Sequence, residues 1–308
     1  MRPSALVLAL APLLAAQVAH AEPVLAPSKG AGLDAAIGGG ALVLAGGFHF
    51  VHGGGDFGDS VIFGGLDRRV RANFSAPAAA TSDALLIATL ALPPALLIGD
   101  TLDRDDGRRL LVYGEAFAIN ALLANGAKHL VARKRPYTYA DDPGVRAFAA
   151  DQGDDAHRSF YSGHSALSFG AAVAGAYLYS ARSNDKSARA LVWGVELAAA
   201  TATANLRVRA GRHYYSDVVI GAAVGTGVGL TVAALRGPDG TFHPSGTDVA
   251  AMAGGVAIGA LASQLLPARR AVLAPVSSSR EASSTSITAQ LIPLVLDHGS
   301  GLAAIGVF

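Results

Sequence analysis

Three short clusters of polar residues have types and spacings that could bind and transform an anion. Each cluster borders a long apolar stretch of the chain. They contain Lys128 and Arg135, then Ser162, Gly163 and His164, and finally Arg207, His213 and Asp217. Lysine and arginine side chains stabilise an oxyanion by charge-assisted hydrogen bonds. A histidine beside a carboxylate can act as a base or as a nucleophile. Together these residue types indicate chemistry on a tetrahedral oxyanion.

The first cluster, "KHLVARKRP", places two cations seven residues apart. Seven residues are two helical turns, so we expect Lys128 and Arg135 to leave one helix face and converge on a single anion. The alternative is a basic patch of Lys128, Arg133, Lys134 and Arg135 that meets lipid headgroups beside a membrane span. Taken alone, the cluster favours this alternative, and only the other two clusters change the balance.

The second cluster directly precedes an apolar run of small residues, in "SFYSGHSALSFG". Ser162 fits the N-cap position, where its side chain would accept a backbone hydrogen bond at the start of a helix. The same helix start would offer free N–H groups to an anion, and Gly163 would let that anion approach the chain. The local sequence does not decide between a cap alone and a cap that also binds an anion.

The third cluster, "LRVRAGRHYYSD", contains a histidine and an aspartate at positions i and i+4. We expect His213 and Asp217 to share a helix face, so that the carboxylate accepts from one imidazole nitrogen and leaves the other free. This is the base–orienter relation of a catalytic triad, with the histidine itself available as nucleophile. An isolated pair of this kind is more often a simple contact on a helix surface.

The composition is too apolar and too poor in charged residues for an ordinary soluble domain. The chain of 308 residues is 51% hydrophobic and 15% charged, with a mean hydropathy of +0.39. An ordinary soluble domain carries roughly 25% charged residues. The net charge of +1 gives no basis for nucleic-acid binding. The absence of cysteine excludes disulfides, thiol nucleophiles and cysteine-ligated metals.

The N-terminus is typical of a secretory signal peptide, predicted at residues 1–21. Arg2 precedes an apolar run, Ala5–Ala16, and an Ala-x-Ala sequence ends at Ala21. An uncleaved first helix is the alternative, although the apolar run is short for a membrane span. We therefore expect an exported protein.

Apolar blocks recur along residues 30–267, which predicts an all-α bundle of about six helices embedded in a membrane, although several blocks could equally be buried helices of a soluble bundle. The blocks are Ala35–Val51, Ala84–Gly99, Leu110–Ala127, Ser165–Ala181, Ala190–Leu206 and Val218–Leu235, with a weaker seventh at Val249–Pro267. Glycines at 221, 225 and 229 predict a close-packing helix face. Pro93 and Pro94 should kink or break their helix.

The remaining segment, residues 268–308, predicts a linker followed by a short β-hairpin. "SSSREASSTS" has the composition of a linker. "ITAQLIPLVLDHGSGLAAIGVF" then fits two strands around a turn.

The three clusters together resemble the type 2 phosphatidic acid phosphatase and vanadium haloperoxidase superfamily. That family's signature is Lys, six residues, Arg-Pro; then Pro-Ser-Gly-His; then Ser-Arg, five residues, His, three residues, Asp. Every internal spacing and the order agree with this chain over residues 128–217, with helical surroundings that extend the likeness to about 110–235. Two positions depart, because Tyr161 replaces the usual proline and Leu206 the usual serine.

The resemblance implies a phosphatase that needs no metal or cofactor. His213 would attack phosphorus to form a phosphohistidine, Asp217 would orient it, and His164 would protonate the leaving alkoxide. The remaining motif residues would hold the phosphate, namely Lys128, Arg135, Ser162, Gly163 and Arg207. The implied substrate is a phospholipid or another phosphorylated small molecule, hydrolysed at a membrane with the active site facing the periplasm.

Three alternatives remain open. A soluble periplasmic acid phosphatase could use the same residues, and so could a vanadate-dependent haloperoxidase, although the haloperoxidases compared are much longer chains. A non-catalytic membrane scaffold is a third, from a different class of protein. The complete set of polar residues at the right spacing argues against it.

Overall fold

The chain divides into two units, Met1–Val272 and Leu273–Phe308, and each is described by itself. The computed structural model describes residues 31–47, 61–98, 103–265, 290–296 and 299–305. The signal peptide predicted at residues 1–21 lies outside the described residues.

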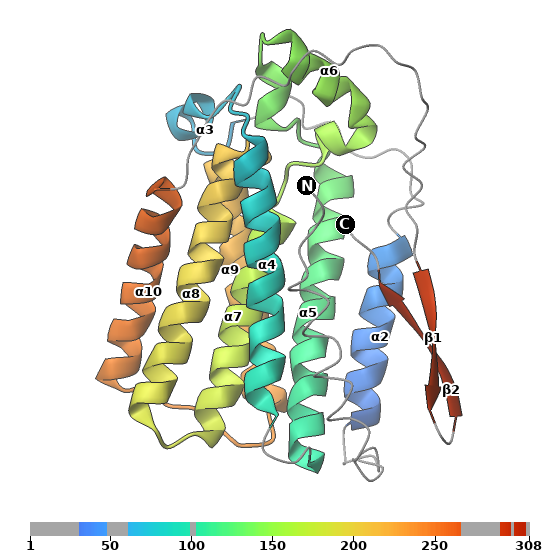
Figure 1. Cartoon of the computed structure of the whole chain (residues 1–308), viewed down its shortest axis with the longest axis vertical. Helices are drawn as coiled ribbons and strands as arrows, with labels where there is room; N and C mark the ends of the chain where they lie inside the picture. Colours follow the sequence, from blue (N-terminus) through green and yellow to red (C-terminus); the bar gives the residue numbers. More distant parts are fainter. Residues whose placement is uncertain (1–30, 48–60, 99–102, 266–289, 297–298, 306–308) are drawn as a thin grey trace. The chain divides into compact units, whose positions relative to one another are not determined.

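The first unit is an all-α bundle in its described residues, as the apolar blocks predict (Figure 1). Its helices are α2 (Ala31–Gly47), α3 (Gly65–Arg69), α4 (Ala76–Leu97), α5 (Arg104–Val131), α6 (Pro143–Asp151), α7 (Gly163–Arg182), α8 (Lys186–Arg209), α9 (Tyr215–Arg236) and α10 (Gly246–Leu265), with 3₁₀ turns η2 (Pro136–Tyr139) and η3 (Gly153–His157). Helix α7 packs against α4, α5, α8 and α9, while α2 lies on α5 and α10 on α8.

The glycines of α9 form the close-packing face that their spacing predicts, and α7 lies against it. A Cβ atom on Gly221 would lie 2.5 Å from the carbonyl oxygen of Ser162, and one on Gly225 would lie 2.2 Å from that of Ala166. Neither separation is sterically possible, so only glycine allows the two backbones to approach this closely. The contact fixes the start of α9 against the start of α7.

Glycine also allows the helix of the weak seventh block to pack closely on its neighbour. Helix α10 lies on α8, and a Cβ atom on Gly255 or Gly259 would come within 2.4 Å of a carbonyl oxygen of α8. The residues that weaken the apolar signal of this block are therefore those that let the helix dock.

Helix α4 runs on through Pro93 and Pro94 to Leu97, so of the kink or break expected there, the break does not occur. A proline leaves the carbonyl four residues earlier without its N–H donor. For Pro94 that carbonyl belongs to Leu90, and it accepts a hydrogen bond of 2.9 Å from the Tyr113 hydroxyl of α5. A neighbouring helix thus supplies the donor that the proline removes.

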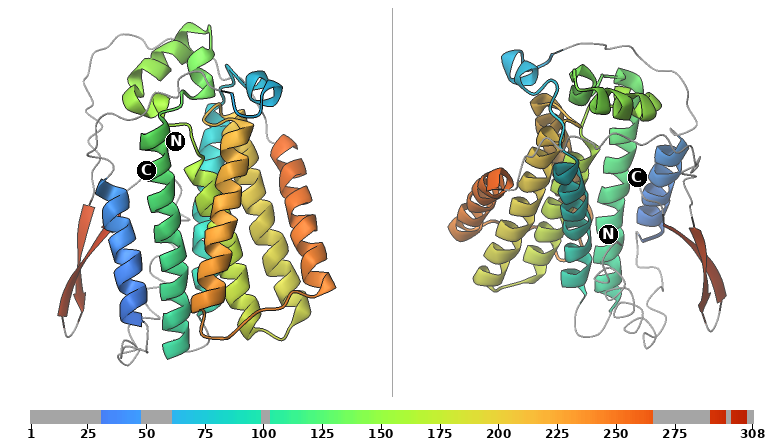
Figure 2. Two further views of the ribbon diagram at one scale, coloured as in Figure 1. Left: turned by 180° about the vertical axis from the view of Figure 1, so that it is seen from behind. Right: turned by 45° about the horizontal axis from the view of Figure 1, so that its top comes forward.

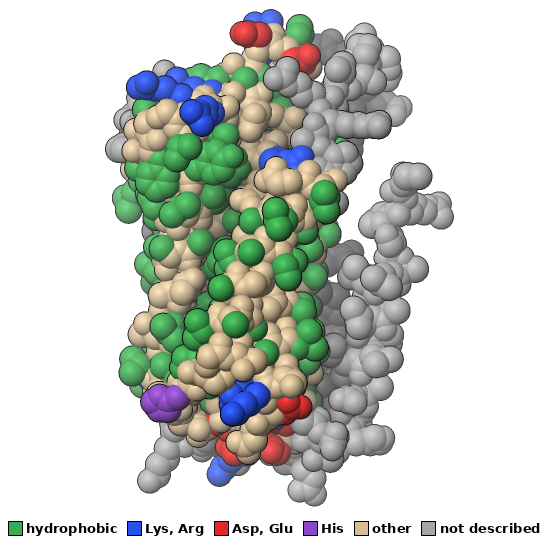
Figure 3. Space-filling view, turned by 90° about the vertical axis from the view of Figure 1, so that its left-hand side faces the viewer, with side chains coloured by type: hydrophobic (Ala, Val, Ile, Leu, Met, Phe, Trp, Pro, Cys, Tyr) green, Lys and Arg blue, Asp and Glu red, His purple; other side chains and the backbone are tan. Residues whose placement is uncertain are grey.

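Four helices of the described residues, α4, α5, α9 and α10, are long and apolar enough to cross a membrane. Figure 3 shows one face of the bundle, on which charged side chains gather toward the two ends and the middle band is apolar. Exposed apolar side chains of α10 include Val249, Val256, Ile258, Leu261 and Leu265. The length and composition of these helices and their exposed apolar side chains suggest a membrane protein.

One end of the bundle collects the elements that carry the three polar clusters (Figure 2). There α5 and α8 end, while α7 and α9 begin, and α3 and α6 lie beyond that end. The opposite end carries the connections from α7 to α8 and from α9 to α10. We refer to these as the site end and the far end of the bundle.

The second unit contains two strands, β1 (Gln290–Leu296) and β2 (Gly299–Ile305), which pair antiparallel. The C-terminal hairpin nevertheless stays a prediction.

Candidate active site

The structure brings the three polar clusters together at the site end. Lys128 lies in the last turn of α5, Arg207 in the last turn of α8, and His213 in the loop before α9. A Cβ atom on Gly163 would lie 3.3 Å from Lys128 Nζ, so the ammonium group sits directly beside the start of α7. The charges of Lys128, Arg135 and Arg207 all act on His213.

Ser162 is the N-cap of α7, as its position predicts. Its Oγ accepts a hydrogen bond of 3.2 Å from the Ser165 amide, and its side chain is fully buried. Its own amide donates to the Asp217 carbonyl oxygen at 3.1 Å, which ties the start of α7 to the first turn of α9.

Lys128 and Arg135 do not share a helix face, contrary to the expectation from their spacing. Helix α5 ends at Val131, and Ala132 adopts a left-handed conformation with φ of 48°. Arg135 lies in extended backbone beyond this turn. Its guanidinium is held by Asp155 of η3, through Nε to the carbonyl oxygen and Nη2 to Oδ1, both at 2.7 Å. The two cations therefore approach each other around a turn of the chain.

His213 makes its close hydrogen bond to the backbone and not to Asp217. Its Nδ1 lies 2.7 Å from the carbonyl oxygen of Ser159, whereas Asp217 Oδ2 is 3.8 Å away. The helical i, i+4 geometry does not apply, because α9 begins only at Tyr215. A carbonyl oxygen can only accept, so Nδ1 carries the proton and the neutral ring keeps its lone pair on Nε2.

Asp217 instead organises the loop around His213. Its Oδ2 accepts from the Ser159 hydroxyl at 2.6 Å and from the Tyr214 amide at 2.9 Å. Ser159 thus contacts Asp217 through its side chain and His213 through its carbonyl oxygen. The carboxylate acts on the imidazole through the position of Ser159.

Arg133 is a central residue of the site that the sequence motif does not indicate. Its side chain is fully buried and donates to Asp217 Oδ1 at 2.6 Å and to Asp67 Oδ2 at 3.0 Å. Its guanidinium also lies over the Tyr214 ring, 3.9 Å from the centroid. In the sequence it is one of three consecutive basic residues, and nothing in that run distinguishes the buried one.

Asp83 of α4 is a second residue that the motif does not indicate. Its Oδ1 lies 2.8 Å from His164 Nε2 and 2.9 Å from Arg207 Nη1. In the sequence, Asp83 only marks the edge of an apolar block. Its partners lie 81 and 124 residues away, so only the fold shows the contact.

The charge state of His213 follows from its surroundings. Burial of the ring lowers its pKa well below the usual value, and the nearby cations Arg135, Arg207 and Lys128 lower it further. His213 is therefore neutral at neutral pH and has an unprotonated Nε2, which is the form that a nucleophile requires.

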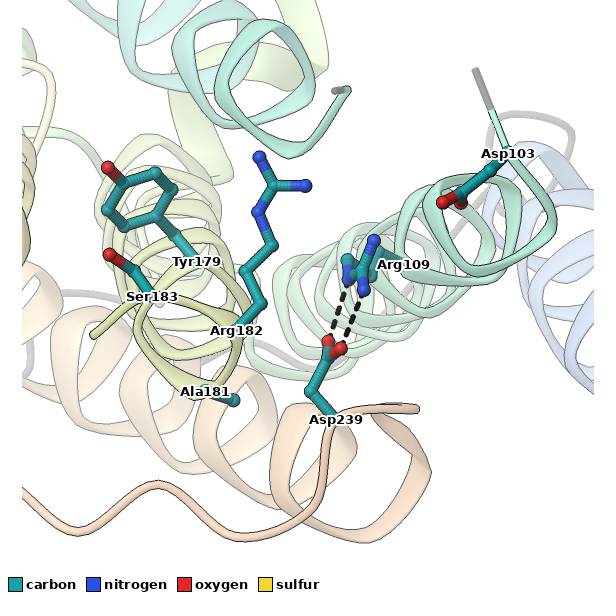
Figure 4. A pocket seen from close by; sticks show the side chains of 7 residues that line it. All are labelled: Asp103, Arg109, Tyr179, Ala181, Arg182, Ser183 and Asp239. Atoms are coloured by element: carbon teal, nitrogen blue, oxygen red, sulfur yellow. Dashed lines mark hydrogen bonds and ion pairs between the residues drawn. The ribbon is translucent and has the colours of Figure 1, made fainter. Parts of the chain in front are cut away.

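A surface pocket of about 670 Å³ lies at the far end of the bundle and contains none of these residues (Figure 4). It is lined by Asp103, Arg109, Tyr179, Ala181, Arg182, Ser183 and Asp239. Arg109 donates to Asp239 through Nε at 2.7 Å and Nη2 at 2.6 Å, and Arg182 pairs with Asp106 at 3.2 Å, so both arginines of this pocket already have carboxylate partners.

A comparison with models of known protein families finds a match for the part of the chain that carries the motif. The family model of the PAP2 superfamily matches residues 109–240. Residues 109–240 belong to the PAP2 superfamily. No curated protein and no solved structure matches the chain.

The PAP2 region runs from α5 through α9 and contains the eight predicted site residues. Its two departures from the family signature are buried apolar contacts. Tyr161 packs in a cluster with Ala124 and Ala166, and Leu206 packs with Ala78 of α4. Asp83, which contacts two motif residues, and Asp67, which contacts Arg133, both precede the PAP2 region in sequence.

Proposed function

We propose that the protein is a phosphatase that hydrolyses phosphomonoesters or pyrophosphates, with lipid phosphates as its substrates, through a phosphohistidine intermediate. Membership of the PAP2 superfamily supports phosphatase activity. One observation carries the mechanism: the hydrogen bond from His213 Nδ1 to the Ser159 carbonyl oxygen leaves an unprotonated Nε2 among three cations.

In the first half-reaction, the lone pair of His213 Nε2 attacks phosphorus. The bond from phosphorus to the ester oxygen breaks, and the leaving alkoxide takes a proton from His164. Lys128, Arg135 and Arg207 stabilise the charge on the three non-bridging phosphoryl oxygens, and the Ser162 hydroxyl and the Gly163 amide act as further donors. The product is phosphohistidine plus the free alcohol.

In the second half-reaction, His164 accepts a proton from water and the water oxygen attacks phosphorus. The bond between phosphorus and His213 Nε2 breaks, which releases inorganic phosphate and restores the neutral ring. His164 is then protonated again for the next turnover. No step requires a group beyond substrate, water and these side chains.

The apolar surface supports a lipid substrate. If the apolar band of Figure 3 lies in a bilayer, the site end lies at one membrane surface, where a lipid phosphate presents its headgroup. We propose that this end faces the periplasm, which fits the signal peptide predicted at the N-terminus. The membrane location fails if the protein is recovered in the salt-washed soluble fraction.

The activity is tested by phosphate release from phosphatidic acid and from p-nitrophenyl phosphate, using protein purified in detergent. His213→Ala should lose at least about 10³-fold in kcat, because the nucleophile is gone. His243→Ala, an exposed histidine at the far end, is the matched control and should retain activity. Equal release by wild type and His213→Ala would contradict the proposal.

The sidedness is tested separately with single cysteines, since the native chain contains none. Asp154→Cys, an exposed position of η3 at the site end, should react with a membrane-impermeant maleimide in intact cells. His243→Cys, at the far end, should react only after lysis. The reverse pattern would contradict a periplasmic active site.

A further inference from the structure

Asp83 contacts two residues of the phosphatase motif from a helix outside the PAP2 region. One oxygen of its carboxylate accepts from His164 Nε2 at 2.8 Å and from Arg207 Nη1 at 2.9 Å. Ser82, its neighbour on α4, also accepts from Arg207 Nη1, at 3.2 Å. The first turns of α4 thus contact the start of α7 and the end of α8.

The contact fixes which nitrogen of His164 can reach a leaving group. Because Nε2 donates to a carboxylate, Nδ1 is the nitrogen left to exchange a proton with an oxygen atom. In the imidazolium form, Nε2–H stays on Asp83 while Nδ1–H can be transferred. After the transfer the neutral ring still donates through Nε2, and Nδ1 can accept a proton from water.

The positive charges around His164 give a second reason for its contact with Asp83. His164 has to be protonated before it can act as an acid, but burial of its ring, together with the nearby positive charges of Arg207 and Lys128, lowers its pKa to about 4. Asp83 is the carboxylate that contacts its ring. The aspartate of a serine protease triad supports its histidine in the same way.

We propose that Asp83 is a positioning residue for His164, which holds the ring by Nε2, favours its protonated form and directs Nδ1–H at the leaving oxygen. The inference rests on the proposed phosphatase function and extends it to a residue that the motif does not include. A purely structural role explains the contact less well, since the Asp83 side chain is 55% exposed and an exposed ion pair contributes little to stability.

The test uses the dependence of the rate on the leaving group. An alkyl phosphate releases a strongly basic alkoxide that needs a proton, whereas p-nitrophenyl phosphate releases a stable phenolate that does not. Asp83→Asn should lower kcat/KM about 10²-fold for the alkyl phosphate and less than about 3-fold for p-nitrophenyl phosphate. In a His164→Ala background, Asp83→Asn should cause no further loss with either substrate.

The matched control is Asp239→Asn, which removes a carboxylate paired with Arg109 at the far end. It should leave the ratio of the two rates unchanged. Inhibition by inorganic phosphate should persist in Asp83→Asn, which shows that the three cations still bind phosphate.

Three results would overturn the proposal. Equal losses for both substrates would show that Asp83 acts only through Arg207 or through the fold. Loss of phosphate inhibition, or of the folded protein, would likewise make Asp83 structural. A wild type that hydrolyses neither substrate would refute the phosphatase function itself, which is a distinct outcome.

Discussion

The guanidinium of Arg133 donates to the carboxylate of Asp217 across 2.6 Å, with both side chains fully buried. The same guanidinium reaches Asp67 of α3, so one cation joins the end of α5 to the first turn of α9 and to α3. Since Asp217 also binds Ser159, which holds the imidazole of His213, the position of the nucleophile depends on this buried ion pair.

Removal of this cation should destabilise the fold. Arg133→Gln leaves Asp217 and Asp67 buried with much weaker partners, and such losses cost about 3–5 kcal/mol. Chemical denaturation in detergent should show this decrease in the free energy of unfolding. Arg146→Gln, an exposed arginine of α6, is the control and should change it by less than about 0.5 kcal/mol. Equal stability of the two variants would contradict the role of Arg133.

The turn before His213 should accept no side chain at Gly211. This residue has φ of +72°, and a Cβ atom on it would lie 1.8 Å from the carbonyl oxygen of Asn73. Gly211→Ala should therefore lose roughly 3 kcal/mol or more of stability, together with the activity. Gly153→Ala also has a positive φ but open space around it, so it should cost only about 1 kcal/mol. Similar melting temperatures for the two variants would refute the steric argument.

The contact of α7 with α9 should be equally sensitive to one methyl group. Gly225→Ala would place Cβ 2.2 Å from the carbonyl oxygen of Ala166, a backbone atom that no rotamer change can move. We expect a loss of about 1–3 kcal/mol and a displaced His213 loop, hence lower activity. Gly227→Ala, which meets nothing within 4 Å, should gain up to about 1 kcal/mol from helix propensity. Thermal unfolding should therefore show a lower melting temperature for Gly225→Ala and a higher one for Gly227→Ala, each relative to wild type.

The pH dependence should reflect the lowered pKa of His213. Only the unprotonated ring is a nucleophile, and burial together with the nearby cations keeps it unprotonated below its usual pKa of about 6.5. In the pH profile of kcat/KM, the midpoint of the acid limb should therefore lie below pH 6.5. Arg135→Gln removes one of these cations, so the pKa should rise and the limb should move to higher pH. An acid limb at or above pH 6.5 that Arg135→Gln leaves unmoved would contradict this account.

The helical class and much of the packing could be predicted from the sequence because those signals are local. In its described residues each apolar block lies on a helix, Ser162 caps α7, and the glycines of α9 contact a neighbouring backbone. The failures concern geometry that neighbours determine. Helix α4 continues through Pro94 because the hydroxyl of Tyr113, on α5, donates to the Leu90 carbonyl oxygen.

In the candidate site, too, local features could be predicted from the sequence, whereas contacts between distant segments could not. Residue types and spacing indicated which side chains to compare, but not how they contact each other. A left-handed Ala132 separates Lys128 from Arg135, and the start of α9 at Tyr215 takes His213 off the helix. Asp83 carries no motif at all, since its role depends on contacts between distant segments of the chain.

The most direct test of the mechanism is to trap the phosphorylated enzyme. Wild-type protein mixed with substrate and quenched in alkali, where phosphohistidine survives, should carry one phosphoryl group, which peptide mass spectrometry should locate on His213. His164→Ala should accumulate more of it when p-nitrophenyl phosphate is the substrate, because the second half-reaction lacks its base. Active enzyme with no trapped phosphoryl group, or with the group on another residue, would contradict His213 as the nucleophile.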